Sequence, residues 1–201
     1  ETHMCNYNWK TFIEVYLDDY HVNSFHPGLG NFVNCRKLKW FFRDSFSVQA
    51  VGISEFKQKG TSTYEKWQGQ VIDFHKIGKL EWGAIWMLIY PNIMVEWYPQ
   101  TVVVSTLYPL EAQKTLNITE FYYAEEVALF REEYVQFQKD AYKETAKEDD
   151  EIAERLEQGK QSMKNENKLN PTFLHPTLEK GIPEFYRYLK KNSSASLRKR
   201  Y

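Results

Sequence analysis

Residues 83–108 read GAIWMLIY-PN-IMVEWY-PQ-TVVVSTLY, and this stretch carries the strongest secondary-structure signal in the chain. Its three apolar runs are rich in β-branched and aromatic residues, and short dipeptides, Pro91-Asn92 and Pro99-Gln100, separate them. Such runs between turn signals are typical of strands joined by hairpins. A further run follows at 115–123, after a polar loop at 109–113. The pattern predicts an antiparallel meander.

A long helical pattern follows these strands. One stripe of residues recurs every three or four positions, namely Val127, Phe130, Tyr134, Phe137, Ala141, Thr145, Asp149, Ile152 and Leu156. This spacing indicates an amphipathic helix that ends near Gly159 or runs on to Met163, either as one unusually long helix or as two with a break near Thr145. Strands followed by such a helix predict an α+β domain in which the helix covers one face of the sheet.

The remaining segments give weaker signals. Residues 8–21 have apolar positions at helical spacing, and residues 38–54 alternate like a strand. Residues 56–81 are polar and irregular, which favours an insertion over the surface, and a short helix is expected near 183–189.

The composition excludes several classes of protein. The 201 residues carry 26 Lys and Arg against 27 Asp and Glu, so nothing favours a nucleic-acid partner. No apolar run approaches the roughly 18 residues that a membrane span needs. With Cys5 and Cys35 as its two cysteines, the chain lacks a disulfide framework, which favours a reducing, cytoplasmic location. Aromatic residues make up 16%, enough for a bulky core or a cavity lined with rings.

Two histidines and one aspartate carry the chemical signal. His21 and His26 lie at the end of a predicted helix, although their spacing alone favours two unrelated histidines. Asp149 falls on the core-facing stripe, where a carboxylate is costly unless it is paired, hydrogen-bonded or bound to a metal. Asp150 lies about 100° away and can reach water. Asp149 therefore either caps a helix break, pairs with a basic residue, or meets both histidines at one metal.

Two imidazoles and one carboxylate on one face of an octahedral ion are typical of non-haem Fe(II) enzymes that activate O₂. Zinc hydrolysis is an alternative, but such zinc sites more often use His-x-x-x-His on a helix, which the chain lacks.

Two segments together resemble the mononuclear-iron motifs of Rieske-type aromatic-ring-hydroxylating oxygenase α subunits. The first comprises Asn8-Trp9-Lys10, Glu14, Asp18, Tyr20-His21 and His26. The second resembles the family's distal Glu-Asp segment and comprises Glu148-Asp149, Glu154, Leu156 and Gly159. Aligning the second segment with the family's motif at Gly159 makes Asp149 the third iron ligand. Aligning it at Gln158 makes Asp150 the ligand instead. The core-facing stripe favours Asp149. Val15 departs from the family, whose members commonly have Asn there.

The resemblance implies a set of roles and a fold. His21, His26 and Asp149 would bind Fe(II), and Asp18 would be the carboxylate that links an iron ligand to a Rieske-cluster histidine of a neighbouring subunit. The implied fold is a helix-grip (START-like) one, an antiparallel sheet curved around a long C-terminal helix. Family electron transfer crosses subunits, so the resemblance also implies a homotrimer.

A Rieske [2Fe-2S] centre needs Cys-x-His and Cys-x-x-His, and neither motif occurs at Cys5 or Cys35. We therefore expect residues 1–201 to form a single catalytic domain, with the Rieske domain upstream of Glu1, on another chain, or lost. By resemblance, electrons would come from NAD(P)H through a reductase or ferredoxin. The substrates would be O₂ and an aromatic or other apolar small molecule.

A non-catalytic module that binds lipid or another small ligand with the same grip-like cavity is the main alternative. In either case, rings on the strands are expected to wall the cavity: Trp86, Tyr90, Trp97 and Tyr98. Rings on the helix are expected to pack against the sheet: Phe130, Tyr134 and Phe137.

Overall fold

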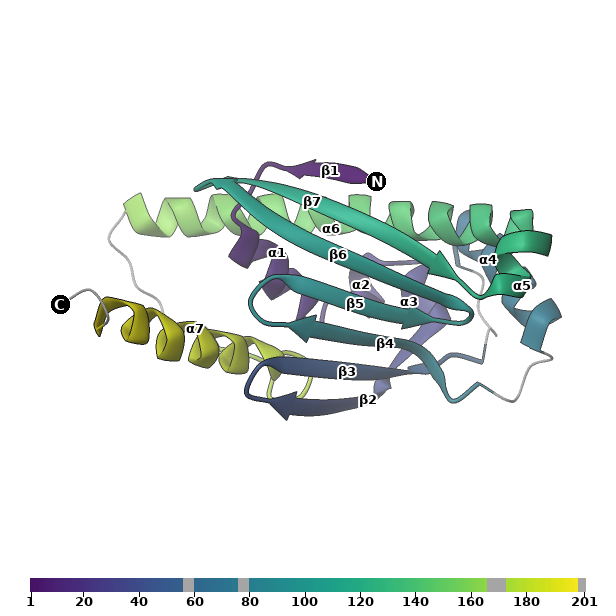
Figure 1. Ribbon diagram of the computed structural model, residues 1–201, viewed down its shortest axis with the longest axis horizontal. Helices are drawn as coiled ribbons and strands as arrows, with labels where there is room; N and C mark the ends of the chain where they lie inside the picture. The colour runs from purple at the N-terminus through teal and green to yellow at the C-terminus, as the bar shows by residue number, and fades with distance from the viewer. Residues whose placement is uncertain (56–59, 76–79, 166–172, 199–201) are drawn as a thin grey trace.

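A seven-stranded antiparallel sheet forms the centre of the computed structural model, which describes residues 1–55, 60–75, 80–165 and 173–198 (Figure 1). The strand order is β1-β7-β6-β5-β4-β3-β2, so β2 to β7 form a continuous meander. The strands are β1 (Thr2–Cys5), β2 (Val33–Arg43), β3 (Phe46–Ile53), β4 (Trp82–Ile89), β5 (Ile93–Tyr98), β6 (Thr101–Glu111) and β7 (Lys114–Tyr123). The predicted meander is confirmed.

The helices lie against one face of this sheet (Figure 1). They are α1 (Trp9–Tyr16), α2 (Val22–Phe25), α3 (Leu29–Phe32), α4 (Ser62–His75), α5 (Glu125–Phe130), α6 (Glu132–Asn165) and α7 (Gly181–Arg198). The long helix α6 runs behind β7, along the β1–β7 side of the sheet (Figure 1). The α+β, helix-grip expectation is confirmed.

The core lies between the sheet and these helices, because alternate strand residues point toward them. Trp86 and Leu88 of β4 are buried, as are Val103 and Leu107 of β6. One core cluster joins the sheet to α3, α4 and α6, and a second joins it to α1 and α7. The space between α1 and α6 is left for side chains from several elements.

Three segment predictions need correction. Residues 38–54 form a hairpin of β2 and β3 rather than one strand, because the chain turns at Asp44-Ser45. Most of 56–81 was wrongly expected to be irregular: α4 is a 14-residue helix that buries Tyr64 and Trp67, and residues 56–59 and 76–79 lie outside the described residues. The short helix expected near 183–189 is part of the longer α7.

The helical stripe after the sheet breaks at Arg131, between α5 and α6, and α6 continues through Thr145 without interruption. This early break leaves Phe130 76% exposed, so it does not pack on the sheet as expected. Tyr134 does pack there and is buried. The helix expected over 8–21 ends at Tyr16, and the strand β1 was not anticipated.

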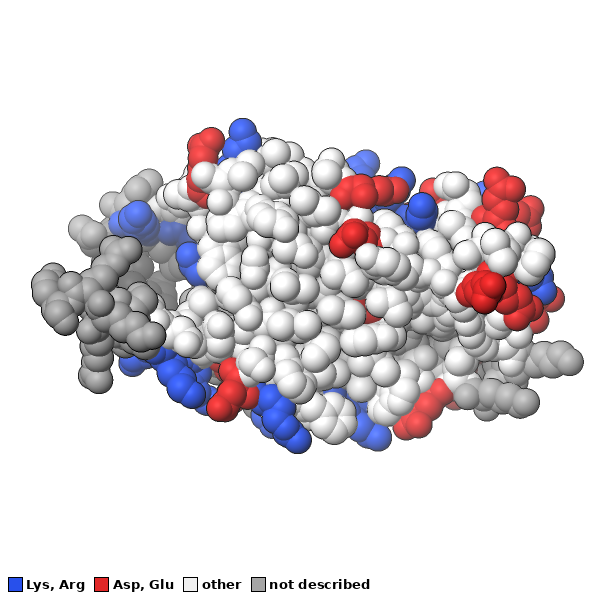
Figure 2. Space-filling model, in the orientation of Figure 1, with Lys and Arg blue, Asp and Glu red and all other residues white. Residues whose placement is uncertain are grey.

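The outer face of the sheet carries few charged side chains (Figure 2). Phe41, Trp97 and Tyr122 are exposed there. Both faces of the central strands are therefore apolar, which explains why their sequences read as continuous apolar runs. Among the described residues, no helix combines the length and apolarity that crossing a membrane requires.

We predict that Gly28→Ala lowers the free energy of unfolding by about 1–3 kcal/mol, because a Cβ there overpacks a buried site. It would lie 2.1 Å from the Tyr64 ring, whose hydroxyl pairs with the Thr145 hydroxyl at 2.6 Å. Gly69→Ala is the control: nothing lies within 4 Å of its Cβ, and alanine in a helix should stabilise by about 0.5–1 kcal/mol. Denaturant unfolding measures the free energy of unfolding of both variants. Equal changes in the two variants would contradict the prediction.

Candidate metal centre

A tight turn after α1 positions both histidines. The Asp18 carboxylate accepts a hydrogen bond from the backbone N–H of Tyr20 at 2.6 Å, which fixes the turn before His21. The single helical turn of α2 follows, and His26 closes it through a backbone hydrogen bond to Val22. This local structure places two imidazoles on the same side of the chain although five residues separate them.

Three ligand atoms converge between this turn and α6. His21 Nε2 lies 3.0 Å from His26 Nε2. Asp149 Oδ1 lies 3.0 Å from His26 Nε2 and 3.4 Å from His21 Nε2. Adjacent ligands on an octahedral ion, bonded at about 2.1 Å and 90° apart, lie about 3.0 Å from one another. The donor atoms therefore fit three adjacent positions around one divalent metal ion.

The outward-facing ring nitrogens are also held by carboxylates. His21 Nδ1 pairs with Asp18 at 3.0 Å, and His26 Nδ1 pairs with Glu148 at 2.7 Å. A hydrogen bond at Nδ1 fixes the tautomer that leaves Nε2 available to a metal. The sequence pattern included Glu148 only as the neighbour of Asp149. Its contact with His26 could not be anticipated without knowing how α6 faces the turn.

The pKa values of His21 and Asp149 are shifted in the directions that favour a cation at this site. Burial lowers the pKa of His21, but hydrogen bonds to Asp149 and Asp18 outweigh that effect and raise it to about 9. Desolvation raises the pKa of Asp149, but hydrogen bonds from both imidazoles dominate and lower it. Asp149 is therefore anionic near neutral pH, and a metal ion must compete with protons for the imidazole nitrogens.

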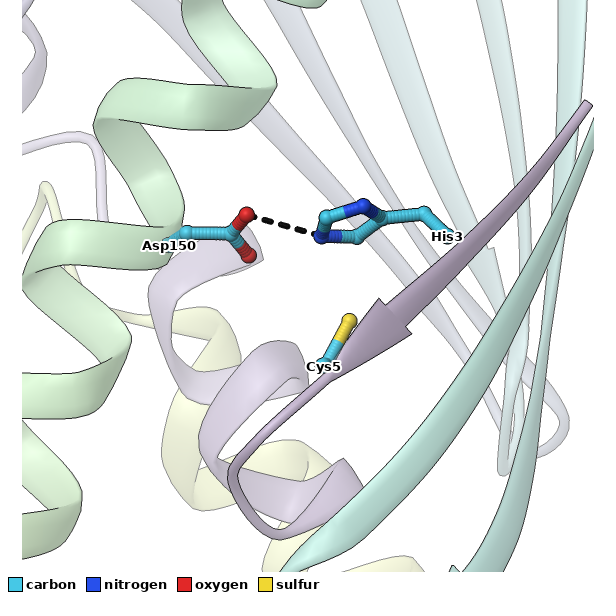
Figure 3. A group of neighbouring side chains, drawn as sticks. All are labelled: His3, Cys5 and Asp150. Carbon is cyan, nitrogen blue, oxygen red and sulfur yellow. Dashed lines mark ion pairs between the residues drawn. The ribbon is translucent and has the colours of Figure 1, made fainter.

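Asp150 belongs to a different group of side chains (Figure 3). Its carboxylate pairs with His3 Nε2 at 2.7 Å and accepts a hydrogen bond from the Tyr7 hydroxyl at 2.6 Å. Burial raises the pKa of the nearby Cys5 thiol to about 11, which disfavours the thiolate that a metal would need. Asp150 reaches water as expected, since its side chain is 24% exposed, and it also ties β1 to α6. Asp149 is the acid that meets the histidines.

A cavity of about 370 Å³ adjoins the three ligand atoms. Its walls combine polar and charged side chains with aromatic rings, which include Trp67, Trp86, Tyr98, Phe121 and Tyr142. Two of the rings expected there lie elsewhere. Trp97 is on the outer face of the sheet, and Tyr90 packs against Phe185 and Tyr188 in the second core cluster. The site thus combines three converging ligand atoms with an adjoining cavity that rings line in part.

The family model for the catalytic domain of the ring-hydroxylating α subunit matches residues 1–194. Two relatives are named putrescine 2-hydroxylase. The one from Bordetella bronchiseptica is 46% identical over 95% of this chain and 45% of its own length. The one from Ralstonia nicotianae is 47% identical over 95% of this chain and 53% of its own length. The chain therefore spans about half the length of these relatives.

Two solved structures share the fold. A quaternary ammonium Rieske monooxygenase has a TM-score of 0.64 at 17% identity, covering 94% of this chain and 48% of its own. Dicamba monooxygenase has a TM-score of 0.67 at 10% identity, covering 96% of this chain and 58% of its own.

We predict that Asp149→Asn lowers Fe(II) affinity by at least about 10- to 100-fold, because the amide removes the anionic ligand between the imidazoles. Asp150→Asn is the matched control and should leave the affinity unchanged, since its carboxylate contacts His3 and Tyr7. Anaerobic Fe(II) titration of both variants measures the difference. If only Asp150→Asn lowered the Fe(II) affinity, the third ligand would be Asp150 rather than Asp149.

Proposed function

The chain belongs to the family of ring-hydroxylating α-subunit catalytic domains, and we propose that His21, His26 and Asp149 hold Fe(II) for the oxidation of a small molecule. The observation that carries this proposal is the convergence of their three ligand atoms within 3.4 Å, at the wall of a cavity of about 370 Å³. Each imidazole is oriented by its own carboxylate, so the ligands are arranged before the ion binds.

The reaction we propose is a hydroxylation. Fe(II) with three protein ligands has open positions for O₂, and with two electrons and two protons one oxygen atom enters a C–H bond and the other leaves as water. The electrons would come from NAD(P)H through a reductase or ferredoxin and a Rieske [2Fe-2S] centre. The protein orients the imidazoles through Asp18 and Glu148, and the aromatic walls exclude bulk water from the substrate.

For the substrate we propose a small aliphatic amine that receives one oxygen atom. The support is the name of the two relatives, which are 46% and 47% identical over nearly the whole chain. A cavity of about 370 Å³ has room for a short diamine. The expectation of an aromatic substrate gains no support from these relatives.

Asp18 has the position suited to an electron route into the site. It contacts His21 Nδ1, and its side chain is 22% exposed while that of His21 is 11% exposed. The contact therefore leads from the metal ligand toward the surface. We propose that a Rieske-cluster histidine of a neighbouring subunit, in a homotrimer, docks at Asp18.

Product analysis with isotopic oxygen tests the proposed function. The full-length protein containing this chain is supplied with 1,4-diaminobutane, reductant, electron-transfer partners and ¹⁸O₂. We expect stoichiometric iron and an amino alcohol with one ¹⁸O atom. An unlabelled product, whose oxygen comes from water, would contradict the oxygenase, and zinc as the bound metal would favour a hydrolase. A protein that holds no metal would be a ligand-binding module.

We predict that Asp18→Asn lowers reductant-driven turnover by about 10- to 100-fold while iron content stays at the wild-type level. The reason is that the amide keeps the shape of the contact to His21 but removes its charge. Asp19→Asn is the control, because burial raises the pKa of Asp19 to about 8 and the group is already protonated at neutral pH. If Asp18→Asn lost iron in proportion to turnover, Asp18 would serve only to hold His21.

A further inference from the structure

A buried carboxylate faces the cavity from β5. Glu96 is 6% exposed and lies among the residues that line the cavity, as does Asp149. The Tyr98 hydroxyl donates a hydrogen bond to Glu96 Oε2 at 2.7 Å. The Tyr142 hydroxyl reaches Oε1 at 3.4 Å, which is long for a hydrogen bond between oxygens. Oε1 therefore keeps capacity to accept a stronger donor.

Within the described part of the chain, no Lys, Arg or His forms an ion pair with Glu96. The two lysines among the lining residues, Lys143 and Lys147, are exposed, and Lys143 pairs with Glu1 at 3.2 Å. Burial raises the pKa of Glu96 to about 7, and the Asp149 charge adds to this effect against the tyrosine hydroxyls. A buried carboxylate without a cation is costly, and a cationic ligand would remove that cost.

Aromatic rings surround this carboxylate. Trp86 Nε1 donates to the Tyr98 hydroxyl at 3.0 Å, so a chain of two hydrogen bonds runs from Trp86 through Tyr98 to Glu96. The Trp67 ring lies edge-on to the Tyr98 ring, with centroids 5.7 Å apart. Rings that line a cavity attract a cation through their π faces. The carboxylate and the rings thus favour the same kind of ligand.

We propose that Glu96 binds the ammonium group of the substrate, and that the site selects primary alkylammonium ions over neutral molecules of the same shape. This inference rests on the proposed function, because it concerns the substrate of the same cavity. The ammonium group donates to Oε1, while Tyr98 holds Oε2 in place. A neutral isostere leaves the carboxylate without a cation, so discrimination comes from Glu96 rather than from cavity shape.

The test compares Glu96→Gln with Glu120→Gln in the full-length protein. Glu120 is a matched control, since it also accepts a hydrogen bond from the tyrosine two residues on, Tyr122, but on the exposed outer face. Calorimetry measures the binding of 1,4-diaminobutane, butylammonium and the neutral 1,4-butanediol. We expect Glu96→Gln to weaken both amines about 10- to 100-fold and to leave the diol unchanged. Glu120→Gln should alter neither, and iron content should match wild type in both variants.

The outcomes separate this inference from the proposed function. Unchanged amine affinity in Glu96→Gln would overturn the role of Glu96, even if the wild-type protein hydroxylates diaminobutane. An equal loss for the amines and the diol would also overturn it, because a general packing defect affects all ligands alike. A wild-type protein that binds iron but no alkylammonium ion would overturn the ammonium site and leave the oxygenase proposal standing. If amines bound in a Glu96-dependent way but were not oxidised, the ammonium site would stand and the oxygenase proposal would be overturned.

Discussion

The contact between Asp149 and the two imidazoles is the interaction on which the arrangement of this protein depends. It joins α6 to a turn more than 120 residues earlier in the chain, and the neighbouring pair of Glu148 with His26 joins the same two segments. Because both acids are on one rigid helix, the depth and rotation of α6 are constrained at this point. The sheet can then curve around α6 only so far as the triad allows, and this constraint sets the space that remains as the cavity.

Tyrosines make several of the contacts between α6 and the rest of the fold. The inner face of α6 carries polar side chains such as Gln138 among its apolar ones, and a polar group in a core needs hydrogen-bond partners. Tyrosines supply them while also packing as rings: Tyr64 contacts Thr145, Tyr123 contacts Gln138, and Tyr7 contacts Asp150. The aromatic residues, 16% of the chain, therefore serve two purposes. Their rings fill volume, and the tyrosine hydroxyls form hydrogen bonds with polar side chains of α6.

The sequence predicts the parts of this structure that have strong periodicity. The meander and α6 follow from apolar spacing, and the three ligand candidates follow from two histidines and a costly acid on an apolar stripe. The helix α4 was missed because its polar residues dilute the period, and β1 because four residues give no period at all. Glu96 had a usable signal. It shares a strand face with Met94 and Tyr98, so it stands as an acid on a buried face, as Asp149 does in α6.

The two acids that face the cavity differ in what can neutralise them. Asp149 has two imidazoles within 3.4 Å, so a metal or a proton compensates its charge. Glu96 has hydroxyl donors alone, so a proton or a cationic ligand must compensate its charge, and burial raises its pKa to about 7. A neutral arene placed against Glu96 would add desolvation without adding a counter-charge, which makes its binding less favourable. An alkylammonium ion supplies that charge and at the same time brings its C–H bonds into the cavity that the metal ligands line. Under the proposed function, the cavity therefore matches an amine better than the ring for which the family is named.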